Sequence, residues 1–296
     1  MMSRQKKALL RLAIPKGSLQ EATVSLFEKA GFRITMSRRS YFPDVDDDSL
    51  KLRLLRPQDI PRYVAKGVVD AGVTGKDWVR ENGADLQIAA ELNYAKRTLR
   101  PIKWVLAVPE DSPIKSVKDL QGKSVSTELV RVTSEYLRSQ GVQANVEFSY
   151  GATEVKVPDL VDAIVELTET GTSLRAHNLR VIGTVMETVT VLAVNNDSWE
   201  DPAKREKIES LVVLLQGAIL AQNKVMLKMN VPQNKIDDVI SILPALREPT
   251  VSPLVHEAWS AVETVVDEKV VRELIPKLKR AGAEGIIEFS LNKVIP

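Results

Sequence analysis

Short apolar runs alternate along much of the chain with segments whose apolar residues recur at helical spacing. The run at 9–14 ends in a Pro-Lys-Gly-Ser turn, and the apolar residues from Leu19 to Ala30 then line one helix face until Gly31. This pattern predicts strand, loop and helix, the opening of a βαβ unit. The alternation favours an α/β protein with mostly parallel sheets. Further strands are expected at 51–55, 68–73, 104–108, 124–126, 162–167 and 188–195.

The pattern changes after a long helix expected at 201–222. The order of strands and helices that follows is β-α-β-β-α-β, the ferredoxin-like split βαβ motif. This order predicts a separate C-terminal module with a boundary near residue 216. The expected strands are 224–231, 249–254, 258–266 and 285–291, and the expected helices are 234–243 and 267–281.

The composition excludes several classes of site. The 296 residues suffice for two or three domains, and they include no cysteine and only two histidines. Disulfides, thiolate catalysis and zinc-ribbon sites are therefore excluded. Any bound metal should be a hard cation held by carboxylates and substrate oxygens. The net charge of +2 does not indicate a nucleic-acid or membrane partner. With no apolar run long enough to cross a bilayer and no secretory pattern, we expect a cytoplasmic protein.

The segment 162–174 carries the most chemical information. It is an apolar strand with acids at Asp162 and Glu166 that enters a Thr-Gly-Thr-Ser turn before a helix. Gly171 lets the backbone turn sharply and approach a ligand closely. Hydroxyls beside the unpaired N–H groups of a helix start form a concavity that binds phosphate, and nearby acids can accept hydrogen bonds from sugar hydroxyls or hold Mg²⁺. A phosphorylated sugar and an ordinary capped turn are both compatible with this pattern. The hydroxyl-bearing residues of the turn are Thr170, Thr172 and Ser173.

Other candidate residues follow expected strands. Lys16 and Gly17 lie at the first strand-to-helix turn, which suits an anion. Asp70 and Thr74 are expected at the carboxyl end of the strand 68–73, the edge at which open α/β sheets bind ligands. Structural turns explain these residues equally well. Two further glutamates could accept a proton or contact a metal, although each alone is compatible with a solvated acid. They are Glu128 and Glu154.

In their order along the chain, these motifs resemble the ATP phosphoribosyltransferase family in its long form. The resemblance covers nearly the whole chain. The matching segments are Ala13–Ser18, Arg56–Val64, Gly67–Asp77, Leu120–Glu128 and Asp162–Leu179, with Met226–Pro232 and Pro249–Pro253 matching the family's C-terminal regulatory domain.

The resemblance implies a two-lobed catalytic region like type II periplasmic binding proteins, followed by a ferredoxin-like βαββαβ regulatory domain. The implied domains are residues 1–97 with 189–215, residues 98–188, and residues 216–296. The implied enzyme is a glycosyltransferase of the pentosyltransferase class, which joins N1 of ATP to C1 of phosphoribosyl pyrophosphate. Mg²⁺ assists, and pyrophosphate is released in this first step of histidine biosynthesis. Histidine is the implied feedback inhibitor, AMP inhibition stays open, and dimers and hexamers are expected.

The resemblance also assigns roles to residues. The turn cradles the 5′-phosphate, and Asp162 meets the ribose hydroxyls. Mg²⁺ is held mainly by substrate oxygens, with Asp162 or Glu154 as the candidate protein ligand. Three departures from the usual pattern stand out. Ser18 replaces Arg, Glu166 and Ser173 replace Asp and Thr, and Pro158–Val161 precedes Asp162 where relatives carry smaller, Gly-containing sequence. The implied catalytic residues are Glu154, Glu128 and Asp162. The implied substrate-binding residues are Lys16, Gly17, Ser18, Arg56, Asp70, Thr74, Thr170, Gly171, Thr172, Ser173 and Leu174. The candidate histidine contacts are Asn230, Thr250 and Ser252.

Two other interpretations compete. A non-enzymatic two-lobed receptor with a sensing domain would explain the lobes but leaves the acidic strand before the turn unexplained. The short, catalytic-only form of the same family lacks the βαββαβ tail that this sequence carries and is therefore rejected.

Overall fold

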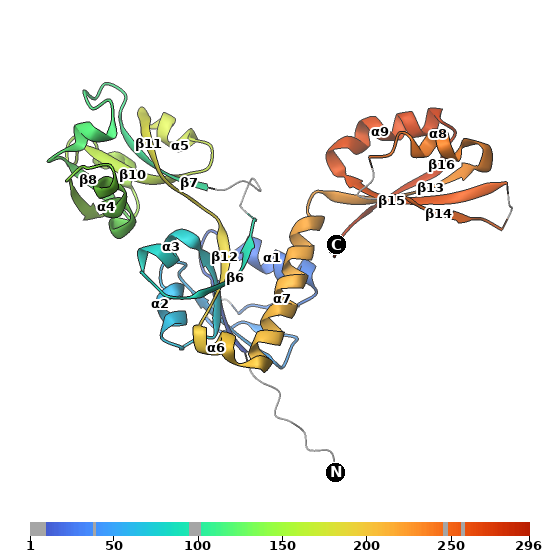
Figure 1. Ribbon diagram of the computed structural model, residues 1–296, viewed down its shortest axis with the longest axis horizontal. Helices are drawn as coiled ribbons and strands as arrows, with labels where there is room; N and C mark the ends of the chain where they lie inside the picture. Colours follow the sequence, from blue (N-terminus) through green and yellow to red (C-terminus); the bar gives the residue numbers. More distant parts are fainter. Residues whose placement is uncertain (1–9, 38–39, 95–101, 245–247, 256–257) are drawn as a thin grey trace, which may run out of the picture. The chain divides into compact units, whose positions relative to one another are not determined.

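The computed structural model describes residues 10–37, 40–94, 102–244, 248–255 and 258–296. Packing divides this part of the chain into two compact units. The first comprises the described residues up to 28 together with 32–212, and the second comprises 29–31 with 213–296. The first unit contains two five-stranded sheets, and the second contains one four-stranded sheet (Figure 1).

The first lobe is built on the sheet β4-β1-β5-β12-β6. Its central strand β1 pairs in parallel with β4 and β5, whereas β12 is antiparallel to both β5 and β6. The strands are β1 (Leu10–Pro15), β4 (Leu50–Leu55), β5 (Ala71–Gly75), β6 (Gln87–Leu92) and β12 (Thr190–Val194). The helices are α1 (Gln20–Ala30), α2 (Ile60–Ala65), α3 (Lys76–Glu81) and α6 (Asn196–Glu200), and a small ribbon pairs β2 (Ile34–Thr35) with β3 (Asp44–Val45).

The second lobe repeats this plan. Its sheet has the order β11-β7-β10-β8-β9, with parallel pairs at β10–β8 and β8–β9 and antiparallel pairs on either side of β7. The strands are β7 (Ile102–Pro109), β8 (Ser124–Thr127), β9 (Asn145–Phe148), β10 (Ala163–Thr168) and β11 (Leu179–Thr188). The helices are α4 (Val130–Ser139) and α5 (Thr172–Ala176), with 3₁₀ turns at Val117–Leu120 and Thr153–Lys156.

The repeated strand order confirms the expected two-lobed architecture of the periplasmic-binding-protein type. In each sheet, the strand that comes first along the chain lies between the second and the third of the three parallel strands, as in β4-β1-β5 and β9-β8-β10. The next strand in the sheet, β12 or β7, is antiparallel to the third and follows a connection between the lobes. The prediction of mostly parallel sheets is wrong for this reason, because each sheet has as many antiparallel pairings as parallel ones.

The second unit has the predicted β-α-β-β-α-β order. Its sheet β14-β15-β13-β16 is antiparallel throughout, and helices α8 and α9 lie on one face of it (Figure 1). Apolar residues alternate along β13 and pack under Val239, Leu274 and Leu278 of the two helices. The elements are β13 (Lys224–Pro232), α8 (Ile236–Ile240), β14 (Thr250–Pro253), β15 (Trp259–Asp267), α9 (Glu268–Arg280) and β16 (Glu284–Ser290), with a 3₁₀ turn at Gln233–Lys235. The long helix α7 (Pro202–Ala221) begins in the first unit and ends in the second.

Candidate active site

A cavity of about 380 Å³ lies between the carboxyl ends of the parallel strands of the two lobes. Open α/β sheets bind ligands at this edge. In the first lobe, Ser18 follows β1, Gln58 follows β4 and Gly75 ends β5. The second lobe contributes Glu128 after β8 and Glu166 within β10. The other lining residues are Leu19, Pro57, Asp77, Trp78, Ile102, Trp104, Leu167, Glu169, Thr188, Val189 and Thr190.

The basic residues of the first lobe lie at the same strand ends. Lys16 follows β1, and its Nζ lies 4.0 Å from the ring centroid of Tyr41. A hydrogen bond from Lys16 lowers the pKa of that exposed tyrosine. Gly17 has a φ of 108°, a conformation that favours glycine. Arg56 is exposed at the end of β4. Their cationic and backbone N–H groups suit an anionic ligand.

Thr74 lies close to this edge but is engaged within the protein. Its side chain is fully buried in β5, and its hydroxyl donates a hydrogen bond of 2.8 Å to the carbonyl oxygen of Pro57. Thr74 therefore shapes the turn that carries Gln58. Within the described part of the chain, Oε1 of Gln58 is buried and has no hydrogen-bond partner. Gln58 lies within the segment Arg56–Val64, but no local sequence pattern marks it as a site residue.

The turn after β10 has the conformation that its glycine predicts. Gly171 has a φ of 71°, and its N–H donates to the hydroxyl of Thr168 at 2.8 Å. Arg175 donates to the carbonyl oxygen of Thr170 at 3.0 Å, so a guanidinium braces the turn from within the following helix. Leu174 is buried in the core of the second lobe and anchors the turn to it. These contacts define the conformation of the turn.

The hydroxyls of the turn are linked to each other and to a carboxylate. The hydroxyl groups of Thr170 and Thr172 lie 2.8 Å apart. Ser173 Oγ donates to Glu154 Oε1 at 2.9 Å. The predicted phosphate turn and one predicted catalytic acid are therefore in direct contact.

Glu166 has a raised pKa at this site. Burial raises the pKa of Glu166 to about 7, and the nearby carboxylates of Glu154 and Glu128 raise it further. Nε2 of Gln58 lies 3.4 Å from Oε2 of Glu128 and donates to it. Within the described ranges, no group of three or more acids, histidines or cysteines could hold a metal ion.

A buried carboxyl joins the two lobes beside the cavity. Asp77 of α3 is 3% exposed, and its Oδ2 accepts a hydrogen bond of 2.6 Å from the indole N–H of Trp104 on β7. Burial raises the pKa of Asp77. Its backbone N–H donates to the hydroxyl of Thr188, at the end of β11. No local sequence pattern marks this role of Asp77, because its partners lie 27 and 111 positions away.

Asp70 lies at the other end of its strand, so its expected position is wrong. The strand β5 begins at Ala71, which puts Asp70 at the amino end, and its side chain is buried against two cations. Arg11 and Lys204 each approach its Oδ1 to 2.8 Å. Although burial raises the pKa of Asp70, these hydrogen bonds lower it well below its usual range. The hydroxyl of Ser198 completes this buried network.

Asp162 is likewise separated from the turn that it was expected to assist. It precedes β10, whereas the turn follows β10, and a strand of this length spans roughly 20 Å. The backbone N–H and hydroxyl of Ser124 donate to its Oδ2 at 2.9 and 2.8 Å, and Lys123 pairs with Oδ1. These contacts, led by the backbone hydrogen bond, lower the pKa of Asp162. Asp162 fixes the start of β10 to β8. The acids of this segment that line the cavity are Glu166 and Glu169.

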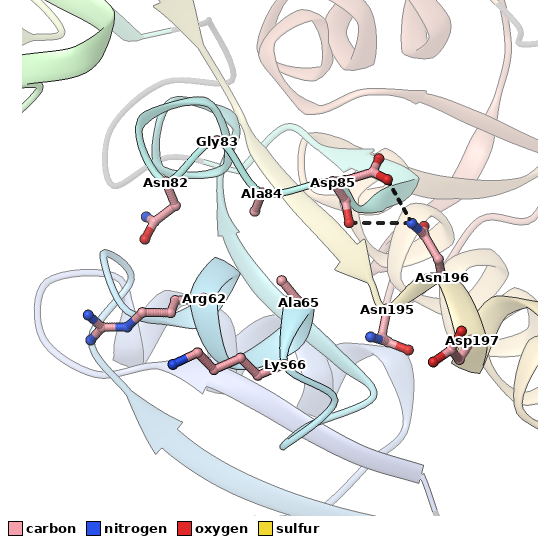
Figure 2. Close-up of a pocket in the computed structure, with 10 residues that line it drawn as sticks. All are labelled: Arg62, Ala65, Lys66, Asn82, Gly83, Ala84, Asp85, Asn195, Asn196 and Asp197. Atoms are coloured by element: carbon pink, nitrogen blue, oxygen red, sulfur yellow. Dashed lines mark hydrogen bonds between the residues drawn. The ribbon is translucent and has the colours of Figure 1, made fainter.

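A second cavity of the first lobe, of about 500 Å³, contains none of the predicted site residues. Figure 2 shows it lined by residues of α2, of the loop after α3 and of the start of α6, with the amide of Asn196 bonded to Asp85. Asn195 follows the end of β12, beside the start of β5. The cavity therefore lies at the amino edge of the parallel strands, the edge opposite the candidate site.

The predicted histidine contacts lie on one face of the C-terminal sheet. Asn230 of β13 is opposite Ala261 of β15, which is opposite Ser252 of β14. Side chains of such cross-strand neighbours point to the same side of a sheet. Thr250 lies in the next row of this face, beside the ion pair of Lys228 and Glu263. The sheet thus brings all three predicted contacts together.

Comparison with known proteins decides which family this architecture represents. A family model described as ATP phosphoribosyltransferase matches residues 56–217, which is more than half of the chain. The chain belongs to the ATP phosphoribosyltransferase family. It is a transferase of the first step of histidine biosynthesis, and its C-terminal unit is regulatory, since a second model, the HisG C-terminal domain, matches residues 221–293.

Full-length relatives of this ATP phosphoribosyltransferase share most of its sequence. The enzyme of that name from Chlorobium luteolum is 58% identical over 287 residues, which cover 97% of this chain and 98% of the relative. The one from Pelotomaculum thermopropionicum is 59% identical, with 97% and 99% coverage. The non-enzymatic interpretation is therefore excluded.

A solved structure, the ATP phosphoribosyl transferase (HisG:HisZ) complex from Thermotoga maritima, matches 72% of this transferase and 99% of the solved chain. The TM-score is 0.62 at 30% identity. Among the described helices of the transferase, none is long and apolar enough to cross a membrane.

Proposed function

We propose that the cleft between the two lobes binds ATP and phosphoribosyl pyrophosphate together and joins N1 of the adenine to C1 of the ribose. The C1–O bond to pyrophosphate breaks as the N1–C1 bond forms, and the adenine amino group then loses a proton. The observation that carries this proposal is the contact between the turn 170–174 and Glu154, which puts an anion-binding turn next to a carboxylate.

The turn is proposed to hold the 5′-phosphate of the phosphoribosyl group. Its backbone N–H groups and the hydroxyls of Thr170, Thr172 and Ser173 are donors suited to phosphate oxygens. Across the cleft, the positive charges of Lys16 and Arg56, with the backbone of Gly17 and Ser18, suit the pyrophosphate and triphosphate groups. This arrangement would stabilise the negative charge that develops on the departing pyrophosphate.

The glutamates are proposed to act on the ribose. Positive charge develops on the ribose ring as pyrophosphate leaves, and the carboxylates of Glu154, Glu166 and Glu128 would stabilise it. Glu166 is proposed to accept hydrogen bonds from the ribose hydroxyls, because it lines the cavity. The sequence assigned this role to Asp162. A glutamate of this cluster accepts the proton of the adenine amino group.

Mg²⁺ is proposed to enter with the substrates. It prefers oxygen ligands and usually binds through one or two carboxylates together with substrate phosphates. Glu154 is the carboxylate best suited to join such a set, since it lies beside the turn. When bound, the ion neutralises charge on the departing pyrophosphate.

The second unit is proposed to bind histidine and to inhibit the reaction. Asn230, Thr250 and Ser252 offer hydrogen-bonding groups on one sheet face, which suits the amino and carboxylate groups of an amino acid. The proposal includes domain boundaries at 97/98, 188/189 and 215/216, homo-oligomers such as dimers and hexamers, and a cytoplasmic location, where ATP and phosphoribosyl pyrophosphate are made. AMP is a second inhibitor to test.

One assay tests this function. ATP, phosphoribosyl pyrophosphate and Mg²⁺ are mixed with the enzyme, and product absorbance in the near ultraviolet is followed with and without histidine. Turnover that histidine suppresses supports both parts of the proposal. Turnover insensitive to histidine contradicts the regulatory part only, and ligand binding without turnover contradicts the proposed reaction.

A further inference from the structure

The helix α3 follows a strand of the first lobe but packs on the second. Trp78 of α3 contacts the core of the second lobe, and its ring meets that of Trp104 edge to face with centroids 6.0 Å apart. At the start of the same helix, Asp77 accepts the hydrogen bond from Trp104. One end of α3 is thus fixed to the second lobe by a buried polar contact and an aromatic pair.

The other end of α3 caps a helix of the second lobe. Oε1 of Glu81 accepts a hydrogen bond of 2.9 Å from the N–H of Arg131, and Oε2 accepts one of 3.0 Å from the N–H of Val132. These are the second and third residues of α4. Their N–H groups are the ones that an N-cap side chain ordinarily satisfies, and the N-cap residue here is Leu129, whose side chain cannot accept a hydrogen bond. A carboxylate is also favoured at this position by the helix dipole.

The capped helix begins directly after a residue of the candidate active site. Glu128 lines the cavity and is followed by Leu129, the N-cap of α4. Glu128 also accepts the hydrogen bond from Gln58, and the side-chain amide of Asn82, next to Glu81, donates to the carbonyl oxygen of Gln58 at 3.0 Å. The position of Glu128 therefore depends on a short stretch of backbone that Glu81 holds.

We propose that Glu81 is a positioning residue of the transferase, which caps α4 from the opposite lobe and so holds Glu128 at the reacting groups. This inference rests on the proposed role of Glu128. The exposed pairs of Arg80 and Arg131 with Glu135 lie at the same interface, but exposed ion pairs contribute little, so we assign the positioning effect to the cap.

The first test measures the cap without any reaction. In the full chain, hydrogen exchange of the amides of Arg131 and Val132 is compared in wild type, Glu81→Gln and Glu135→Gln. Glu81→Gln keeps one acceptor oxygen and loses the charge, so we expect exchange at these two amides to accelerate at least tenfold. Glu135→Gln, the matched control, removes a carboxylate from the same interface and should change exchange there less than threefold. Equal protection in wild type and Glu81→Gln would overturn the cap.

The second test measures positioning by kinetics. We expect Glu81→Gln to lower kcat about tenfold with a smaller change in KM, and Glu135→Gln to change either parameter less than twofold. In a Glu128→Gln background, the Glu81→Gln effect should shrink to less than twofold, since the residue that it positions is gone. If Glu81→Gln still lowers kcat tenfold in the Glu128→Gln variant, Glu81 does not act through Glu128, and the proposal is overturned.

The two tests separate this inference from the proposed function. If Glu128→Gln alone leaves turnover unchanged, the proposed role of Glu128 fails, and positioning of Glu128 fails with it, whereas the exchange test still reports whether Glu81 caps α4. If Glu128→Gln lowers turnover but Glu81→Gln does not, the proposed function stands and the positioning role alone is wrong.

Discussion

Ser173 Oγ donates a hydrogen bond of 2.9 Å to Oε1 of Glu154. The two residues come from separate segments of the second lobe, Ser173 from the first turn of α5 and Glu154 from the 3₁₀ turn before β10. This contact connects the turn proposed for the 5′-phosphate to an acid proposed to act at the ribose. A change at either residue should therefore alter the other's function.

Removing this hydroxyl should weaken substrate binding. We expect Ser173→Ala to raise the KM for phosphoribosyl pyrophosphate about tenfold, or about 1.4 kcal/mol, because a hydrogen bond to a charged group is lost. Ser173→Thr keeps a hydroxyl and should stay within about twofold of the wild type. Steady-state kinetics with ATP saturating give both values. An unchanged KM in the alanine variant would separate Ser173 from the substrate.

The titration of Glu166 should be visible in the stability of the protein. Its pKa is raised to about 7 by burial, with Glu154 and Glu128 adding to the rise. Between pH 4.5 and 7 the native state therefore holds a proton that the unfolded chain has released, so the stability due to this group is lost as the pH rises through that range. In Glu166→Gln this loss is absent. We expect the difference in unfolding free energy to move in favour of the variant by about 3 kcal/mol between pH 4.5 and 8.

Urea unfolding at several pH values measures this difference. Asp111→Asn, which removes the same charge from an exposed position of the second lobe, is measured alongside as the control. A pH-independent difference for Glu166→Gln would contradict the raised pKa. The same variant should also remove an inflection near pH 7 from the pH dependence of kcat/KM.

Asp70 should contribute to stability and not to catalysis. Asp70→Asn leaves Arg11 and Lys204 without their buried counter-charge, and breaking a buried pair by removing one partner is strongly destabilising. We expect a loss of about 3 kcal/mol in urea unfolding, with both KM values unchanged at a temperature where the variant is folded. An increased KM with unchanged stability would return Asp70 to the substrate site that the sequence assigned.

The sequence predicted most strands because their residues are either uniformly apolar or alternate regularly. The strand β13 is an example, with buried residues at every second position from Val225 to Val231. The strand β11 was not predicted, because register shifts after Val181 and Thr184 interrupt its alternation. The position of Asp70 was predicted wrongly because the apolar residues Val68 and Val69 before it resemble the start of a strand, whereas β5 begins at Ala71.

The other features that the sequence did not predict depend on contacts between residues far apart in the chain. The counter-charge of Asp70 at Lys204 lies 134 positions away, and the amides capped by Glu81 lie 50 and 51 positions away. No local pattern marks such pairs. The conformation of the turn 170–174 was predictable because its glycine and hydroxyls form contacts within the turn itself. The sequence did not show which end of β10 faces the cavity, so it could not distinguish Glu166 from Asp162 as the acid beside the ligand.

Mg²⁺ should bind the enzyme only together with substrate. Mg²⁺ usually binds through one or two carboxylates together with substrate phosphates, and among the described residues no group of three acids or histidines could hold a metal ion. Calorimetric titration of Mg²⁺ into the free enzyme should give no measurable heat at millimolar concentration, and titration in the presence of phosphoribosyl pyrophosphate should give a clear isotherm. Removing Mg²⁺ with a chelator should stop turnover, and adding it back should restore turnover fully. Tight binding to the free enzyme would contradict a substrate-borne ion.

Histidine inhibition should depend on the open face of the C-terminal sheet. Asn230 and Ser252 share a cross-strand row, so one ligand can contact both, and we expect Asn230→Ala or Ser252→Ala to raise the histidine concentration for half-inhibition at least tenfold. The lost hydrogen bonds lie outside the catalytic unit, so kcat without histidine should not change. Met226→Leu, on the same face of β13 but further along the strand, is the control and should keep inhibition. If both alanine variants keep full inhibition while the wild type binds histidine, the inhibitor binds elsewhere on this chain.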